Sequence, residues 1–109
     1  MVIDADNAVA PGPMLNLLLA AGACSATDVV VILGKMRVKL ASLAVELTGT
    51  RRDEEPRRYV AIHFTFRLRG DGLDTAKARR AIDLSLEKYC SVVHSLAPDT
   101  RVAYELVLE

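Results

Sequence analysis

The stretch MLNLLLAAGACSATDVVVIL, residues 14–33, decides the fold of this chain. It is apolar nearly all round a helix, which is typical of a helix buried on every side, in a protein core or in lipid. Pro13 suits a first helical turn, where its missing N–H costs nothing, and no other proline follows before Arg37. The sequence therefore predicts one long interior helix over residues 14–37.

Polar residues inside this helix argue against a membrane span. Asp28 lies well within the stretch, and a charged residue near the bilayer centre costs at least ~3 kcal/mol. A core helix is the better interpretation, so we expect no membrane partner. A domain of this size buries only about 60 to 65% of its unfolded surface and cannot cover such a helix alone. We therefore expect a second copy of the chain to cover it, in a homodimer.

Composition narrows the classes of function. The 109 residues, of which 51% are hydrophobic, suit a single domain over residues 1–109. Fourteen Lys and Arg balance fourteen Asp and Glu, and a zero formal charge offers no electrostatic footprint for nucleic acid. The first residues, MVIDAD, lack the basic region of a secretory signal, which predicts a cytoplasmic protein.

The two cysteines, Cys24 and Cys90, are too few for a secreted disulfide scaffold. No CxxC motif and no Cys/His ligand cluster accompanies them, so the sequence predicts no metal site. The cysteines are therefore either core residues or reactive groups.

The rest of the chain predicts an α+β fold in the order αββαβ. Alternating apolar residues at 43–47 and 60–68, joined by a polar link, predict an antiparallel hairpin. Asp74 is a candidate N-cap for a helix over residues 75–89, followed by a shorter helical piece at 90–96 and a last strand at 102–108. The long buried central helix would then pack on an antiparallel sheet.

Two segments in this order resemble a known family. Pro13-Met14 is followed by LLLAAGAC at residues 17–24, and EKYCSV stands at residues 87–92, with a predicted ββα unit between them. The chain is similar here to the family of osmotically induced protein C (OsmC) and the organic hydroperoxide resistance (Ohr) proteins. The resemblance implies an OsmC-like, intertwined dimer in which two long central helices pack together and the sheets wrap around them.

The resemblance also implies a chemistry. Catalytic members of the family are thiol-dependent peroxidases that use no cofactor. By position, Cys24 on the central helix would attack an organic hydroperoxide, and Cys90 would resolve the sulfenic acid as a disulfide. A thiol reductant would then be a partner of the protein.

The chain departs from the family pattern in two places. Met14 stands where the hydroperoxide resistance branch has a glutamate, and no arginine precedes Arg37 to supply the family's N-terminal arginine. The family's N-terminal strands are expected to be shortened or missing. The pattern is nearer to a less characterised OsmC-like branch that keeps both cysteines without that glutamate and arginine.

The residues themselves leave the roles of the two thiols open. Cys24 has no cation or helix N-terminus beside it in the sequence, and an ionised Asp28 on the same helical face would oppose its thiolate. Cys24 could instead be a small buried core residue. His94, four residues after Cys90, could favour a Cys90 thiolate or simply face solvent. Cys90 as the attacking thiol therefore stays open.

Two hypotheses of function follow. The first is a homodimeric thiol peroxidase that reduces hydroperoxides through Cys24 and Cys90, in an apolar pocket at the dimer interface, with Asp28 and His94 as possible neighbours. The second is a non-catalytic dimeric domain that binds an apolar small molecule in that pocket. The missing glutamate and arginine favour the second.

Overall fold

The described part of the chain begins with one long helix. The computed structural model describes residues 11–109, and its first element is α1 (Pro13–Lys35). The helix ends when the N–H of Met36 bonds to the carbonyls of Ile32 and Leu33 and Arg37 takes a left-handed φ of 62°. The long helix predicted from the apolar stretch is confirmed, and it ends two residues earlier than expected.

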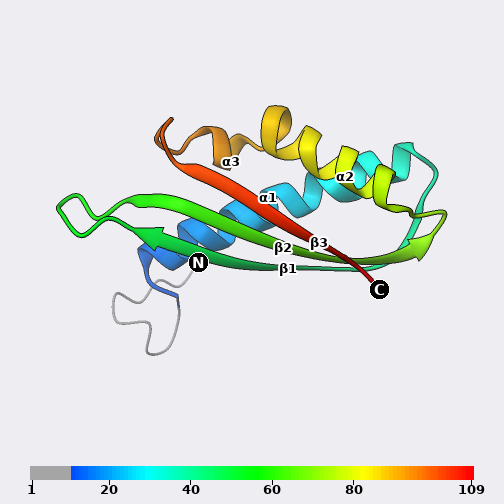
Figure 1. Cartoon of the computed structure of the whole chain (residues 1–109), viewed down its shortest axis with the longest axis horizontal. Coiled ribbons are helices and arrows are strands. Elements are labelled where there is room, and N and C mark those ends of the chain that lie inside the picture. The colour runs from blue at the N-terminus through cyan, green and yellow to red at the C-terminus, as the bar shows by residue number, and fades with distance from the viewer. Residues whose placement is uncertain (1–10) are drawn as a thin grey trace.

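Three strands form one sheet beside α1 (Figure 1), namely β1 (Lys39–Arg51), β2 (Tyr59–Asp71) and β3 (Arg101–Leu108), in the order β1-β2-β3. The β1-β2 hairpin is antiparallel, as predicted. β3 pairs parallel to β2, so the expectation of a wholly antiparallel sheet is wrong for this strand. The helical segment after β2 carries the chain back along the sheet, and β3 therefore starts beside the beginning of β2.

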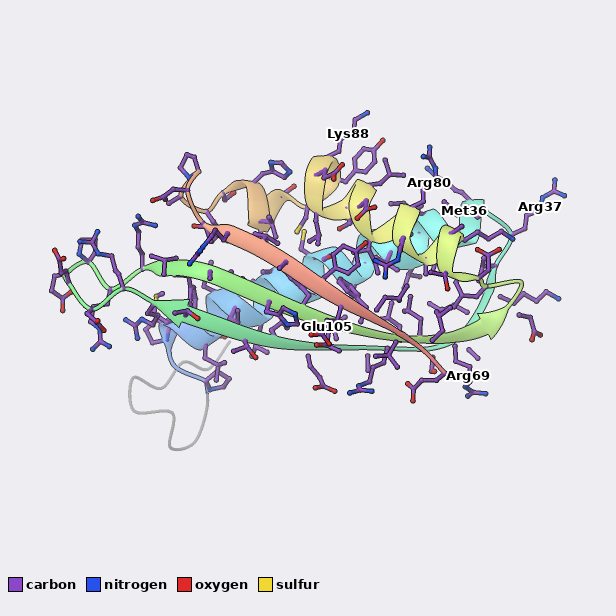
Figure 2. All side chains as sticks on the ribbon, viewed as in Figure 1. Met36, Arg37, Arg69, Arg80, Lys88 and Glu105 are labelled. Carbon is purple, nitrogen blue, oxygen red and sulfur yellow. The ribbon has the colours of Figure 1, made fainter. Side chains whose placement is uncertain are left out.

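The second helical segment has three parts: α2 (Thr75–Leu84), a π-helical turn η1 (Ser85–Tyr89) and the short α3 (Ser91–His94). Asp74 caps α2 as predicted, since its side chain accepts a hydrogen bond of 2.8 Å from the N–H of Lys77. The αββαβ order and the α+β class are confirmed. The labelled Arg80 and Lys88 point outward from this segment (Figure 2).

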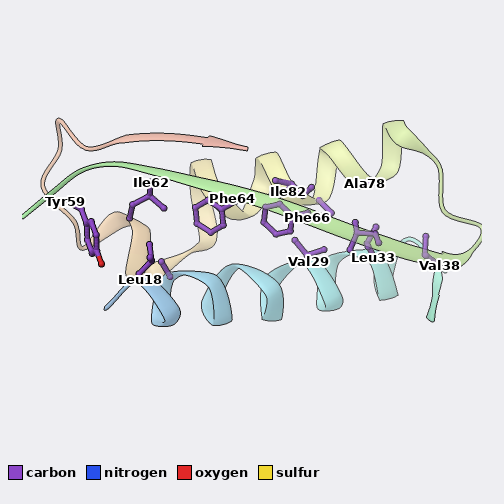
Figure 3. Close-up of a cluster of buried hydrophobic side chains, with 13 residues drawn as sticks. Leu18, Val29, Leu33, Val38, Tyr59, Ile62, Phe64, Phe66, Ala78 and Ile82 are labelled. Carbon is purple, nitrogen blue, oxygen red and sulfur yellow. The ribbon is translucent and has the colours of Figure 1, made fainter. Parts of the chain in front are cut away.

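The core lies between one face of the sheet and the two main helices (Figure 3). Alternate residues of β2 point into it, as the period of two requires. The buried set comprises Ile62, Phe64, Phe66 and Leu68 of β2, Leu18, Val29 and Leu33 of α1, and Ala78 and Ile82 of α2. This packing fixes α1 against α2 and η1, where the two cysteines meet.

One face of α1 stays exposed in the single chain. Val30 and Val31 are 49% and 51% exposed, and Leu15, Leu17 and Leu19 also reach the surface. The helix is long and apolar enough to cross a membrane by length and composition, with a mean hydropathy of 2.0 over a window that is only 33% buried. The burial on all sides predicted from the sequence is therefore not reached within one copy of the chain.

Candidate functional site

Four residues of α1 make one stripe toward the second helical segment. Ala21, Cys24, Ser25 and Asp28 are spaced three and four residues apart, so they lie on the same side of the helix. Ala21 and Ser25 are fully buried, whereas Cys24 and Asp28 are partly exposed at the edge of the contact. The stripe therefore presents a thiol and a carboxylate beside the packed interior.

The π-helical turn η1 supplies the other half of the site. The N–H of Cys90 bonds to the carbonyl of Ser85 at 2.7 Å, a bond between residues five apart. Cys90 itself is extended, with φ −72° and ψ 101°, and stands directly before α3. The wider turn lets Ser85 and Cys90 both face α1 although they are five residues apart. Single π-turns of this kind are frequent at functional sites.

The fold brings the two sequence-predicted cysteines together with Asp28. The Sγ atoms of Cys24 and Cys90 and a carboxylate oxygen of Asp28 all lie within 4.8 Å of one another. Both thiols are free in this structure. A disulfide needs an S–S distance of about 2.05 Å, so the two sulfurs must approach each other before they can bond.

Cys90 is the deeper of the two thiols. It is fully buried, and its Sγ lies 4.0 Å from the carbonyl oxygen of Ala21, to which the thiol donates. The pKa of Cys90 is raised to about 11. Burial is the largest cause, the nearby Cys24 also raises the pKa, and the N–H groups of Val93 and Val92 lower it in part. Cys90 is therefore a protonated thiol at neutral pH, whereas Cys24 is the thiol that reaches the surface.

A chain of hydroxyl groups holds Asp28 in place. The Ser85 hydroxyl donates to Asp28 Oδ2 at 2.9 Å, and the Ser25 and Ser85 Oγ atoms are also 2.9 Å apart. Because the one proton of Ser85 goes to the carboxylate, Ser25 is the donor between the two serines. Asp28 was predicted from the sequence as a possible neighbour of the thiols, whereas neither serine was predicted. Their signal was helical spacing, since Ser25 precedes Asp28 by three residues and Ser85 follows Ile82 by three.

His94 lies apart from the two thiols. Its side chain is exposed and lines a surface cavity of about 370 Å³ with neighbours such as Leu96 and Pro98. Helical spacing predicted that His94 and Cys90 share one face, but Cys90 precedes α3 in an extended conformation and is buried, whereas His94 is exposed, so that shared face does not form. The candidate site is therefore Cys24, Cys90 and Asp28 without the imidazole.

An open cavity adjoins the site on the Asp28 side. Its volume is about 440 Å³, and its walls are Asp28, Val31, Ile32, Lys35, Leu84 and Tyr89. Most of these side chains are apolar, and Asp28 connects the cavity to the two sulfurs. A small apolar molecule with one polar end would find both kinds of contact there.

The same three residues could also hold a metal ion. Two cysteine sulfurs and a carboxylate oxygen are donors that Zn²⁺ accepts, and a fourth donor would complete a tetrahedron. No sequence motif predicts this set, because Asp28 and Cys90 are far apart along the chain. The geometry alone therefore suits either thiol chemistry or a soft cation.

Comparison with known proteins decides the family. The family model described as "OsmC-like protein" matches residues 5–105. This chain belongs to the OsmC-like family. Protein YhfA of Escherichia coli K12 is 46% identical to it over 100 residues, which are 90% of this chain and 75% of that protein. The resemblance inferred from the two cysteine segments is thus confirmed.

Solved structures of OsmC-like fold agree. The crystal structure of a hypothetical protein from Aquifex aeolicus VF5 is 33% identical, with a TM-score of 0.82 over 93% of this chain and 77% of that one. The organic hydroperoxide resistance protein OhrB of Bacillus subtilis is 16% identical, with a TM-score of 0.63 over 96% of this chain and 75% of that one. At that identity OhrB shows the shared fold alone.

Members of the OsmC-like family are soluble globular proteins, and the described part of this chain forms one globular body with a single long apolar helix. Family membership indicates a role related to stress or to hydroperoxides.

Proposed function

We propose that this OsmC-like protein reduces organic hydroperoxides with Cys24 as the attacking thiol and Cys90 as the resolving thiol. The single observation that carries the proposal is the approach of the two sulfurs and the Asp28 carboxylate to within 4.8 Å of one another. Cys24 is the more accessible of the two cysteines. Burial keeps Cys90 protonated until the Cys24 sulfenic acid has formed. OhrB, which shares the fold, is named for resistance to organic hydroperoxides.

The chemistry takes two steps in one protomer. The Cys24 thiolate attacks one oxygen of the hydroperoxide, so an S–O bond forms, the O–O bond breaks, and the alcohol leaves after taking up a proton. Cys90 then displaces water from the Cys24 sulfenic acid to form the disulfide. An external thiol reductant, in the cytoplasm, returns both cysteines to thiols. The apolar walls of the cavity beside Asp28 would bind the organic part of the peroxide.

The proposal includes a homodimer. The exposed apolar residues of α1, such as Leu19, Val30 and Val31, need cover from water. A second copy of the chain supplies a matching apolar helix by symmetry. Burial of this face in a lipid bilayer is less favourable, because the carboxylate of Asp28, which accepts a hydrogen bond from Ser85, would lie inside the membrane. Val31 also lines the cavity, so the second copy would close the site from that side.

One experiment tests the peroxidase. The reduced protein is treated with cumene hydroperoxide, and free thiols are counted by mass. The wild type should lose two thiols per chain, Cys24→Ser should lose none, and Cys90→Ser should stop at a sulfenic acid on Cys24. Unchanged thiols in the wild type would end the peroxidase proposal.

A second candidate is a non-catalytic domain that binds an apolar small molecule. It is favoured by Met14, which stands where the hydroperoxide resistance branch has a glutamate, and by the apolar cavity of about 440 Å³. Inert thiols together with binding of a hydrophobic fluorescent probe, lost in Val31→Glu, would support this candidate instead.

A further inference from the structure

The resolving step leaves a proton to be moved. Cys90 enters it as a protonated thiol, since burial raises its pKa to about 11. Its present hydrogen-bond acceptor is the carbonyl of Ala21, which cannot take the proton away. The hydroxide that leaves the Cys24 sulfenic acid needs a proton at the same moment. A group close to both sulfurs that can accept and return a proton would serve both needs.

We propose that the Asp28 carboxylate is the proton carrier of the resolving step, a role that rests on the proposed hydroperoxide reduction by Cys24 and Cys90. The position of the group carries the argument. Within residues 11–109, the cluster of donor atoms around the two sulfurs contains one carboxylate oxygen, that of Asp28, within 4.8 Å of both. Proton transfer then requires these atoms to approach to hydrogen-bond distance from within 4.8 Å of one another.

The step balances in atoms and electrons. The Cys90 sulfur gives its electron pair to the Cys24 sulfur, the S–S bond forms, and the S–O bond of the sulfenic acid breaks. Asp28 takes the Cys90 thiol proton and passes it to the departing hydroxide, which leaves as water. The carboxylate ends as it began, and the thiol reductant later supplies two electrons and two protons to reopen the disulfide.

Ser85 and Ser25 act as positioning residues. Ser85 donates to Asp28 Oδ2 at 2.9 Å and is itself held by Ser25 at the same distance, and both serines are fully buried. One carboxylate oxygen is thereby fixed, while a carboxylate has further lone pairs to accept the thiol proton. Asp28 also lines the open cavity, through which the product water can leave.

The test separates the two chemical steps. Single turnovers with cumene hydroperoxide, in the presence of a chelator, are quenched at intervals, and Cys24 sulfenic acid is trapped with dimedone and counted beside the disulfide. In Asp28→Asn the sulfenic acid should form at least as fast as in the wild type, because the carboxylate charge no longer opposes the Cys24 thiolate. The disulfide should form about 100-fold more slowly, as expected for loss of acid–base catalysis. The amide keeps the size of the side chain and can still accept from Ser85.

Asp83→Asn is the matched control. Asp83 is also half-buried and accepts a hydroxyl hydrogen bond, from Tyr104 at 2.8 Å, but it lies outside the sulfur cluster. Both steps should keep their wild-type rates in this variant. If Asp28→Asn is unfolded by circular dichroism, Ser85→Ala takes its place, with about tenfold slower disulfide formation expected and an unchanged rate counting against the proposal.

The outcomes separate this proposal from the one on which it rests. A wild-type chain that keeps both thiols overturns the peroxidase proposal and the proton carrier with it. A wild type that forms the disulfide, while Asp28→Asn forms it equally fast, overturns the role of Asp28 alone.

Discussion

Selective alkylation of the two cysteines measures the burial of Cys90 directly. The raised pKa of about 11, against an ordinary value of 9.0, lowers the thiolate fraction of Cys90 at neutral pH by a factor of about 100. Only the thiolate reacts with iodoacetamide at a useful rate. Folded Cys90 should therefore react at least about 100-fold more slowly than Cys90 in the urea-unfolded chain at the same pH, while the partly exposed Cys24 is labelled first.

The assay is a time course of labelling, followed by digestion and mass spectrometry of the peptides that hold Cys24 and Cys90. The sign of the pH dependence follows from the raised pKa. The ratio of the labelling rates of Cys90 in the unfolded and the folded chain should be largest below pH 9 and should fall as the pH rises toward 11. Cys24→Ser is the control, since Cys90 should stay slow without its neighbour. Labelling of Cys90 before Cys24, or equal rates in the folded and unfolded chain, would refute the assignment of Cys90 as the resolving thiol.

Three further predictions concern the packing of α1 and the sheet. Val31→Glu should weaken self-association at least about 100-fold in analytical ultracentrifugation, because it places a charge in the apolar contact between the two copies. The control Ala76→Glu, at an exposed position of α2, should leave self-association unchanged. A monomeric wild type would contradict the dimer. Phe66→Ala should lower the free energy of unfolding in urea by about 3–5 kcal/mol, since the ring is fully buried, and a loss under 1 kcal/mol would count against this core. A Cβ at position 22 would meet the flexible end of the Leu47 side chain, which must shift, while alanine gains about 0.5–1 kcal/mol over glycine inside a helix. Gly22→Ala should therefore change the free energy of unfolding by less than about 1 kcal/mol alone and should be more favourable beside Leu47→Ala; purely additive changes would show that the two sites do not touch.

The sequence correctly predicted the helix that is apolar on all sides and the strand that is buried on one face. The unbroken apolar run at residues 14–33 required an interior helix, and the alternation through Phe64 and Phe66 required a half-buried strand. These patterns predict which side chains are shielded from water, and the structure buries Phe64 and Phe66 as predicted. The family resemblance then placed Cys24 and Cys90 in one site.

The remaining features depend on contacts that a periodic pattern does not record. Alternation in residues 102–108 is the same for either strand direction, so β3 was assigned to an antiparallel sheet although it runs parallel to β2. The π-turn before Cys90 breaks the helical period, and the predicted shared face of Cys90 and His94 is lost with it. Ser85 was hidden because a buried serine is explained only by its partners, Ser25 and Asp28, which come from another helix.

A peptide map of the oxidised protein is the sharpest test of whether Cys24 of α1 and Cys90, which follows η1, form a redox site within one chain. The protein is treated with one equivalent of organic hydroperoxide, digested without reductant, and examined by mass spectrometry beside a non-reducing gel. We expect a crosslinked peptide pair holding Cys24 and Cys90, with the chain still migrating as a monomer on the gel. Thiols that stay free, or a disulfide that joins two chains, would contradict it.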